Sequence, residues 1–297
     1  MKNKLSDDEV KSIAAHAKRG DVVVRLWLLA ALGAALVFGY HRLIFDHLAM
    51  VFNDPKEDMS FAWYVPLFSM YVVWRERAGI AASLRDSSWL GAVVALPFLF
   101  IGFLGTRGIQ VRLEMVAFAG LLLTLPWAFF GFDTAKKIVF PVGFLLFCVP
   151  MSSFLDIVTV HLRLFATGTA EAILRGTGVD VVRTGTMIVT SGGGFAIDVA
   201  DPCSGLRSIF ALMALTAGYA YFTQPTWMRR AILFSFSIPI AVAGNVMRIL
   251  SIVMVGTYAS GSFATGFYHD YSGYVVFIVA IFLMVACGEA VSKVFRK

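Results

Sequence analysis

Residues 238–250 read IPIAVAGNVMRIL and belong to a longer apolar run over residues 230–257. A helix that crosses the hydrocarbon core of a bilayer needs about 20 mostly apolar residues. The run is long enough for such a helix, and beyond its first residue only one charged residue, Arg248, interrupts it. The stretch therefore predicts a membrane-spanning helix with an arginine in its interior.

The composition extends this prediction to the whole chain. Of 297 residues, 59% are hydrophobic and 15% are charged, against about 25% charged in a typical soluble domain. These values predict an all-α polytopic membrane protein. We assign the net charge of +6 to basic residues that flank membrane helices, and expect no nucleic-acid partner. Three cysteines without CxxC spacing disfavour a disulfide framework or a zinc site, and no motif indicates a cofactor.

About eight stretches are candidates for spanning helices. They are residues 22–45, 61–75, 88–105, 113–131, 137–152, 204–223, 230–257 and 273–292. An even number of spans puts both termini on one side of the membrane. The first stretch follows a polar tail, residues 1–21, and lacks a cleavage site, so we expect an uncleaved anchor. No internal repeat or linker divides the chain, which predicts one domain over residues 1–297.

The basic residues predict the orientation, because cytoplasmic loops are enriched in Lys and Arg. Sixteen of the 25 Lys and Arg fall on the side of the termini, including those at residues 136–137 and 229–230. This side is therefore expected to be cytoplasmic. The acidic loop at residues 54–58 falls on the other side, in agreement.

Residues 153–203 depart from the apolar pattern on the outer side. Residues 153–174 are amphipathic and predict a helix lying at the membrane interface. Three β-branched stretches follow, at residues 179–183, 186–190 and 195–199, with Gly185 and the glycine run 192–194 between them. We expect a small external β-hairpin that leads the chain to Cys203.

Cys203 lies in the sequence ADPCSGLR, residues 200–207, where a polar segment becomes apolar. Asp201 suits a helix N-cap and Pro202 the first helical position, so Cys203 is expected in a first helical turn. A helix N-terminus lowers the pKa of a thiol, whereas the Asp201 carboxylate raises it, and the sign of the sum stays open. Gly205 leaves room for a substrate backbone. The alternative is a small buried cysteine that packs a helix end, the interpretation we give to Cys148 and Cys287.

Arg248 and His269 are expected on the same face of the membrane as Cys203. An arginine at mid-bilayer costs about 2.5–3.5 kcal/mol on insertion scales, so Arg248 needs a partner, a wet cavity or room to snorkel. Asn245, three residues earlier, lies on the same helix face. His269 belongs to an external stretch, residues 266–273, where the alternative is a plain solvated side chain.

Together these side chains are the parts of a cysteine acyl-transfer site. The Cys203 thiolate would attack a peptide carbonyl, Arg248 would stabilise the oxyanion, and His269 would transfer the proton. The roles of Arg248 and His269 can be exchanged or shared. The sequence leaves contact among the three side chains open.

Several motifs resemble the exosortase/archaeosortase family of membrane cysteine transpeptidases. They are PCSGLRS at 202–208, NVMR at 245–248, His269 followed by Gly273, YVPL at 64–67 and FPVGFLLF at 140–147. The resemblance runs from about residue 50 to the end. It departs from the family at residues 58–62, which read DMSFA.

The resemblance implies a function and a set of site residues. Cys203 would be the nucleophile and Arg248 and His269 the other catalytic residues, with Asn245, Ser204 and Gly205 in support. Substrates would be exported proteins with a C-terminal signal made of a short motif such as Pro-Glu-Pro, a transmembrane helix and a basic cluster. The place would be the bacterial inner membrane, among lipids, with the site on the periplasmic face. The intramembrane Arg248 alone also fits an alternative, a multi-pass transporter or assembly factor for envelope polysaccharide, with Arg248 binding an anionic substrate.

Overall fold

The computed structural model describes residues 23–24, 27–54, 59–84, 87–150, 152–191, 194–198 and 206–295. The chain groups into two compact units, Met1–Pro150 and Met151–Lys297. Each unit is described by itself, and the single domain expected over residues 1–297 stays a prediction.

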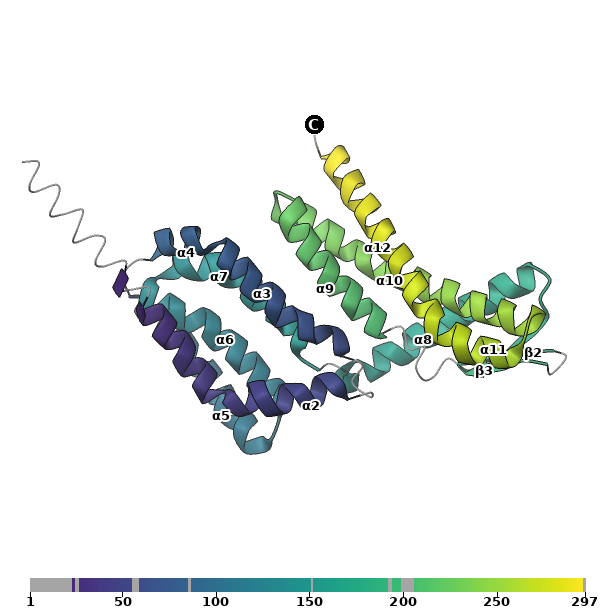
Figure 1. Cartoon of the computed structure of the whole chain (residues 1–297), viewed down its shortest axis with the longest axis horizontal. Helices are drawn as coiled ribbons and strands as arrows, with labels where there is room; N and C mark the ends of the chain where they lie inside the picture. The colour runs from purple at the N-terminus through teal and green to yellow at the C-terminus, as the bar shows by residue number, and fades with distance from the viewer. Residues whose placement is uncertain are drawn as a thin grey trace, which may run out of the picture. The chain divides into compact units, whose positions relative to one another are not determined.

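The first unit consists of helices and short connections, with no strand among its described residues (Figure 1). Its elements are the helix Trp27–Gly39, η1 (Leu43–His47), α2 (Leu48–Asn53), η2 (Ser60–Trp63), α3 (Tyr64–Arg75), α4 (Arg77–Ser83), α5 (Trp89–Gly108), α6 (Val111–Phe130), α7 (Phe132–Phe144) and η3 (Leu145–Cys148). Helices α5 and α6 pack closely because Gly91 has no side chain: a Cβ there would lie 2.4 Å from the Ala128 nitrogen.

The second unit combines long helices with a small sheet. It contains α8 (Ser152–Gly176), β1 (Val181–Thr184), β2 (Met187–Thr190), β3 (Ala196–Asp198), α9 (Leu206–Thr223), α10 (Trp227–Tyr258), α11 (Gly261–Phe263), η4 (Ala264–Tyr268) and α12 (His269–Val294). Helices α9, α10 and α12 lie side by side, and the sheet lies toward the α11 end of α10 (Figure 1). The predicted amphipathic helix at residues 153–174 is present as α8.

The predicted strands form a three-stranded antiparallel meander, one strand more than the expected hairpin. The strand order is β1-β2-β3, with Val182 opposite Val189 and Ile188 opposite Ile197. Gly185 makes the first turn with a φ of 64°, a conformation that glycine adopts without strain. The inward side chains Val181, Ile188 and Ile197 are buried in one core with residues of α8 and α10. This core fixes the sheet on the helices.

Phe195, just before β3, packs its ring against Gly256 of α10. Three hydrogen bonds hold its backbone: the Thr190 amide and hydroxyl donate to the Phe195 carbonyl over 2.9 and 3.2 Å, and the Phe195 amide donates to the Thr190 hydroxyl over 3.0 Å. A Cβ on Gly256 would lie 2.6 Å from the ring, inside van der Waals contact. The absence of a side chain at 256 is therefore part of the packing.

Replacing Gly256 by alanine is expected to weaken the packing of the sheet on α10. Overpacking a buried contact costs about 1–3 kcal/mol, which should lower the midpoint of thermal unfolding of the purified protein in detergent. Gly143→Ala in α7 is the matched control, because a Cβ there meets nothing within 4 Å. Equal midpoints for the two variants would contradict this packing argument.

Four helices are long and apolar enough to cross a membrane: Trp89–Gly108, Val111–Phe130, Trp227–Tyr258 and the broken helix Gly261–Val294. A fifth is present if the bent pair Trp27–Gly39 and Leu43–Asn53 counts as one span. The fold class is confirmed, a helical polytopic protein with a small sheet. The count of eight spans is not confirmed, because α3 and α7 have 12 and 13 residues. At 1.5 Å per residue such helices are about 20 Å long, too short for a bilayer core of about 30 Å.

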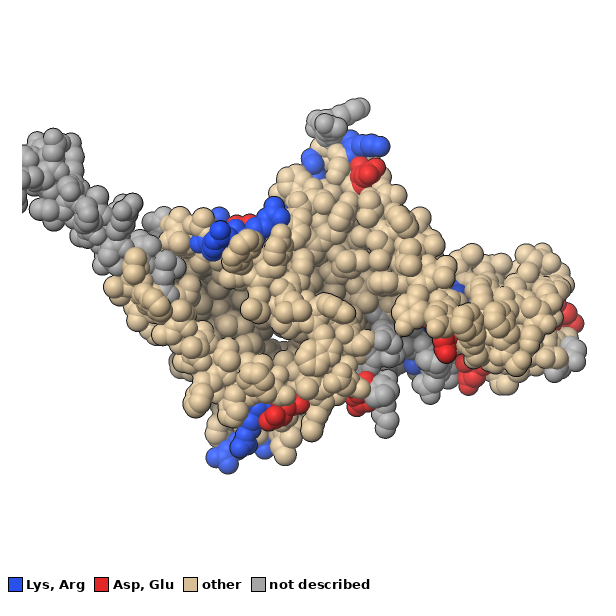
Figure 2. Space-filling model, viewed as in Figure 1, with Lys and Arg blue, Asp and Glu red and all other residues tan. Residues whose placement is uncertain are grey.

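The helices long enough to cross a membrane carry few charged residues between their ends, with Arg248 of α10 among them. Figure 2 shows broad uncharged surfaces over the helix bodies. In the second unit, Arg229 at the start of α10 donates a hydrogen bond to the Phe295 carbonyl beyond the end of α12. The start of α10 and the end of α12 thus share one end of this unit, as the predicted topology requires.

Candidate active site

Arg248 of α10 bonds to the first turn of α12. Its Nη2 donates a hydrogen bond to the His269 carbonyl oxygen over 3.0 Å, and its Nε donates to the Ser272 hydroxyl over 3.3 Å. The structure therefore brings Arg248 and His269 together, although they are 21 residues apart in the chain. The contact uses the main chain of His269, not its imidazole.

His269 is more enclosed than the sequence suggested. The expected external loop at residues 266–273 is largely helical: η4 ends at Tyr268 and His269 opens α12. The reason lies just upstream, where the Ser260 hydroxyl accepts a hydrogen bond from the Phe263 amide and begins a new helix almost directly after α10. The side chain of His269 is only 12% exposed. A solvated loop histidine is thus excluded.

The His269 ring lies next to a carboxylate. Its Nδ1 is 3.4 Å from Oδ1 of Asp270, which is 75% exposed. In the tautomer with the proton on Nδ1, the ring donates this hydrogen bond and carries its lone pair on Nε2. That is the form in which a histidine accepts a proton from a reacting group.

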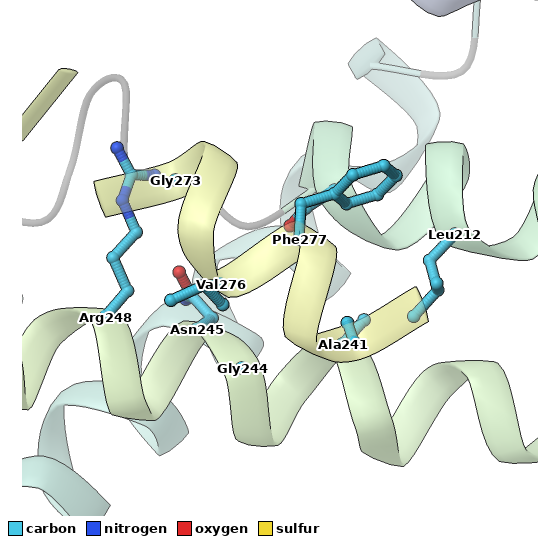
Figure 3. A pocket seen from close by; sticks show the side chains of 10 residues that line it. Leu212, Ala241, Gly244, Asn245, Arg248, Gly273, Val276 and Phe277 are labelled. Atoms are coloured by element: carbon cyan, nitrogen blue, oxygen red, sulfur yellow. The ribbon is translucent and has the colours of Figure 1, made fainter. Parts of the chain in front are cut away.

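A small pocket lies beside these residues, between α9, α10 and α12. It is lined by Ser208, Leu212, Ala241, Gly244, Asn245, Arg248, Gly273, Val276, Phe277 and Ala280. Figure 3 shows the Arg248 guanidinium beside Gly273 and the Asn245 side chain directed toward Val276. Asn245 is 8% exposed, so its amide faces this pocket and not bulk water. Arg248 and Asn245 share one helix face, as their spacing predicted.

The predicted nucleophile itself lies outside the described residues, as do Ser204 and Gly205. Ser208 of α9 is the nearest residue after Cys203 whose side chain is described, and it lines the pocket with Arg248 and Gly273. The start of α9, which contains the last residues of the cysteine motif, therefore lies at the Arg248 site.

The Arg248 guanidinium uses only part of its set of hydrogen-bond donors on the described residues of α12. Among the described residues its partners are a carbonyl and a hydroxyl, both neutral, which engage Nε and Nη2. Within the described part of the chain, no carboxylate pairs with Arg248 and nothing accepts a hydrogen bond from Nη1. An arginine held this way can bind an oxygen that carries negative charge.

A family model described as transmembrane exosortase matches residues 52–286. The chain belongs to the transmembrane exosortase family. No curated protein and no solved structure matches the chain. The family resemblance read from the motifs is confirmed, and with several apolar helices the protein is a multi-pass membrane protein.

The match spans the whole candidate site of this exosortase. Cys203, Arg248 and His269 all fall within residues 52–286. The other two cysteines sit elsewhere: Cys148 is buried in the first unit, with its Sγ 3.8 Å from the Ala62 carbonyl, and Cys287 of α12 is not among the residues that line the Arg248 pocket. In the described part of the chain no three His, Cys, Asp or Glu side chains are grouped to hold a metal ion.

Sequence reasoning missed Ser272, which contacts both Arg248 and His269. It is buried, at 5% exposed. Its position three residues after His269 places it on the same face of α12, which is the one signal that the sequence offers. Its contact with Arg248 depends on how α10 and α12 pack.

Proposed function

We propose that the protein is a cysteine transpeptidase or endopeptidase that cleaves the C-terminal sorting signal of exported proteins. The observation that carries the proposal is the bonded pair of Arg248 and His269, beside the start of α9. Family membership supports it, because the matched range includes Cys203, three positions before α9 begins at Leu206. Ser208 is five positions after Cys203 in the chain, so their Cα atoms are at most about 18 Å apart.

The chemistry assigns one step to each residue. The Cys203 thiol gives its proton to Nε2 of His269, and the thiolate attacks the scissile carbonyl carbon as the carbonyl electron pair moves to oxygen. Arg248 N–H groups stabilise this oxyanion by charge-assisted hydrogen bonds. As the C–N bond breaks, the protonated His269 gives its proton to the leaving amine, which departs with the C-terminal helix. An amine or water then attacks the thioester and regenerates the thiol.

The charge distribution supports a location for this reaction. Arg248 lies in the C-terminal half of α10 and His269 opens α12, whereas Arg229, Arg230 and Lys293 lie at the opposite ends of these helices. By the positive-inside rule, the basic end is cytoplasmic and the site faces the periplasm of the bacterial inner membrane. Exported proteins reach that face after translocation, with their signal helix still in the lipid.

Isolation of the acyl-enzyme tests the proposal. The full-length protein is co-expressed with a tagged exported protein of the same organism that ends in a short motif, a helix and a basic cluster. We expect a covalent conjugate that hydroxylamine cleaves and that mass spectrometry maps to Cys203. A conjugate on another residue, or cleavage products with no conjugate under rapid acid quench, would contradict the thioester route.

A further inference from the structure

Ser272 closes a ring of hydrogen bonds with Arg248 and His269. Its hydroxyl donates to the His269 carbonyl over 3.0 Å and accepts from Arg248 Nε over 3.3 Å. The third side of the ring is the bond from Arg248 Nη2 to the same carbonyl, over 3.0 Å. A serine hydroxyl has one donor and two acceptor lone pairs, so both of its bonds form at once.

The ring takes one whole edge of the guanidinium. Nε–H and one N–H of Nη2 point the same way in the planar fork, and Ser272 and the His269 carbonyl accept these two. With a single acceptor, the group would still turn about that bond. Two acceptors fix its plane, which leaves the Nη1 end of the fork directed away from α12.

Gly273 leaves the space in which the Arg248 guanidinium lies. A Cβ at this position would lie 3.3 Å from Cζ of Arg248, closer than such contacts normally are, and 3.5 Å from Nη2, in van der Waals contact. The guanidinium therefore lies against the backbone of α12, as Figure 3 shows beside Gly273. Two neighbouring residues, a serine that bonds and a glycine that makes room, set where the charge of Arg248 sits.

We propose that Ser272 is a positioning residue of the acyl-transfer site: with the His269 carbonyl it holds one edge of Arg248 so that the remaining N–H groups meet the developing oxyanion. This inference rests on the proposed function. Ser272 acts through Arg248 and touches no reacting atom. A well-placed donor to an oxyanion contributes far more than the same group free to rotate, because it needs no reorganisation during the reaction.

The reactivity of Cys203 toward iodoacetamide tests this inference without a substrate. A nearby cation favours the thiolate, which is the species that reacts. Purified full-length protein is treated with iodoacetamide across a pH series, and mass spectrometry follows the peptide with Cys203. In Arg248→Ala we expect the rate near neutral pH to fall about tenfold, with the midpoint of the pH profile moved up. In Ser272→Ala we expect a shift in the same direction and a fall of roughly threefold.

Two further variants make the result specific. Ser272→Thr keeps the hydroxyl and should restore the wild-type profile, which covers the case that Ser272→Ala folds poorly. Ser251→Ala is the matched control, because the Ser251 hydroxyl donates to the backbone carbonyl of Arg248 over 2.8 Å and not to its guanidinium. Its profile should equal that of the wild type.

The outcomes separate the inference from the proposed function. A shift in Arg248→Ala with a wild-type profile in Ser272→Ala overturns the role of Ser272 and leaves the proposed function standing. Unchanged profiles in both variants mean that the Arg248 charge does not act on Cys203, which overturns the inference, while the acyl-enzyme experiment decides the proposed function separately. Equal shifts in Ser272→Ala and Ser251→Ala, or no recovery in Ser272→Thr, would reduce Ser272 to a general packing role.

Discussion

Replacing Cys203 by alanine should abolish removal of the C-terminal signal from an exported substrate while the protein stays in the membrane at its normal level. Loss of a catalytic nucleophile lowers the rate by at least about a thousandfold, because the remaining residues have no group to carry the acyl chain. The measurement is an immunoblot of a substrate tagged before and after its signal, with membrane levels of the variant determined in the same samples.

Cys203→Ser sharpens this result. A hydroxyl is far less ionised than a thiol, so the serine variant should be nearly as inactive as the alanine variant. Cys287→Ala is the matched control, because Cys287 is a half-buried cysteine of α12 that does not line the Arg248 pocket. It should process the substrate normally. Cleavage of the substrate by Cys203→Ala would contradict the transpeptidase proposal. Full activity of Cys203→Ser would exclude a thiolate nucleophile.

The small sheet was the part of the fold most open to prediction, because its signals are local. Val181, Val182, Ile188 and Val189 are β-branched residues that favour extended backbone, and Gly185 marks the turn between them. The structure places β1 and β2 within two residues of the predicted strands. The third strand, β3, makes the sheet a meander and not the expected hairpin. It begins directly after Phe195, whose ring packs against Gly256 of α10.

The span count and the setting of His269 depended on distant contacts. Apolar composition alone does not reveal that α7 gives way to the short 3-10 helix η3 after Phe144, so residues 137–152 are not one long helix. The sequence also did not predict that residues 261–269 are helical, because the glycines at 261 and 266 favour a loop. The one irregular residue of this stretch, Gly266, has φ −97° and ψ −110°. The contact of Ser272 with Arg248 depends on how α10 packs against α12, which the sequence does not show.

The candidate site was predicted in part. The sequence placed Arg248, Asn245 and His269 on one side of the membrane, and in the structure the first two line one pocket while Arg248 bonds to His269. An argument from topology predicts on which side of the membrane a residue lies, but it does not predict which side chains touch. Contact of Cys203 with either residue stays a prediction, since Cys203 lies outside the described residues.

Arg248→Lys should be nearly as inactive as Arg248→Ala, even though it keeps the charge. The structure gives the reason: Arg248 bonds to two acceptors on α12 through one edge and keeps its Nη1 donors for another oxygen. A lysine ammonium is a compact point charge without this fork, so it cannot satisfy both acceptors and present donors at the same distance. Loss of one oxyanion donor costs about 100- to 1000-fold in turnover.

The kinetic signature distinguishes catalysis from binding. An interaction made only in the transition state lowers kcat and kcat/KM together, so Arg248→Lys should leave KM near its wild-type value. Arg183→Ala is a suitable control, because Arg183 pairs with Glu171 over 3.0 Å on α8, where no residue lines the Arg248 pocket. A raised KM with unchanged kcat would make Arg248 a binding residue. If Arg248→Ala abolished function while Cys203→Ala did not, the transporter alternative would be favoured, because an anion-binding arginine needs no thiol.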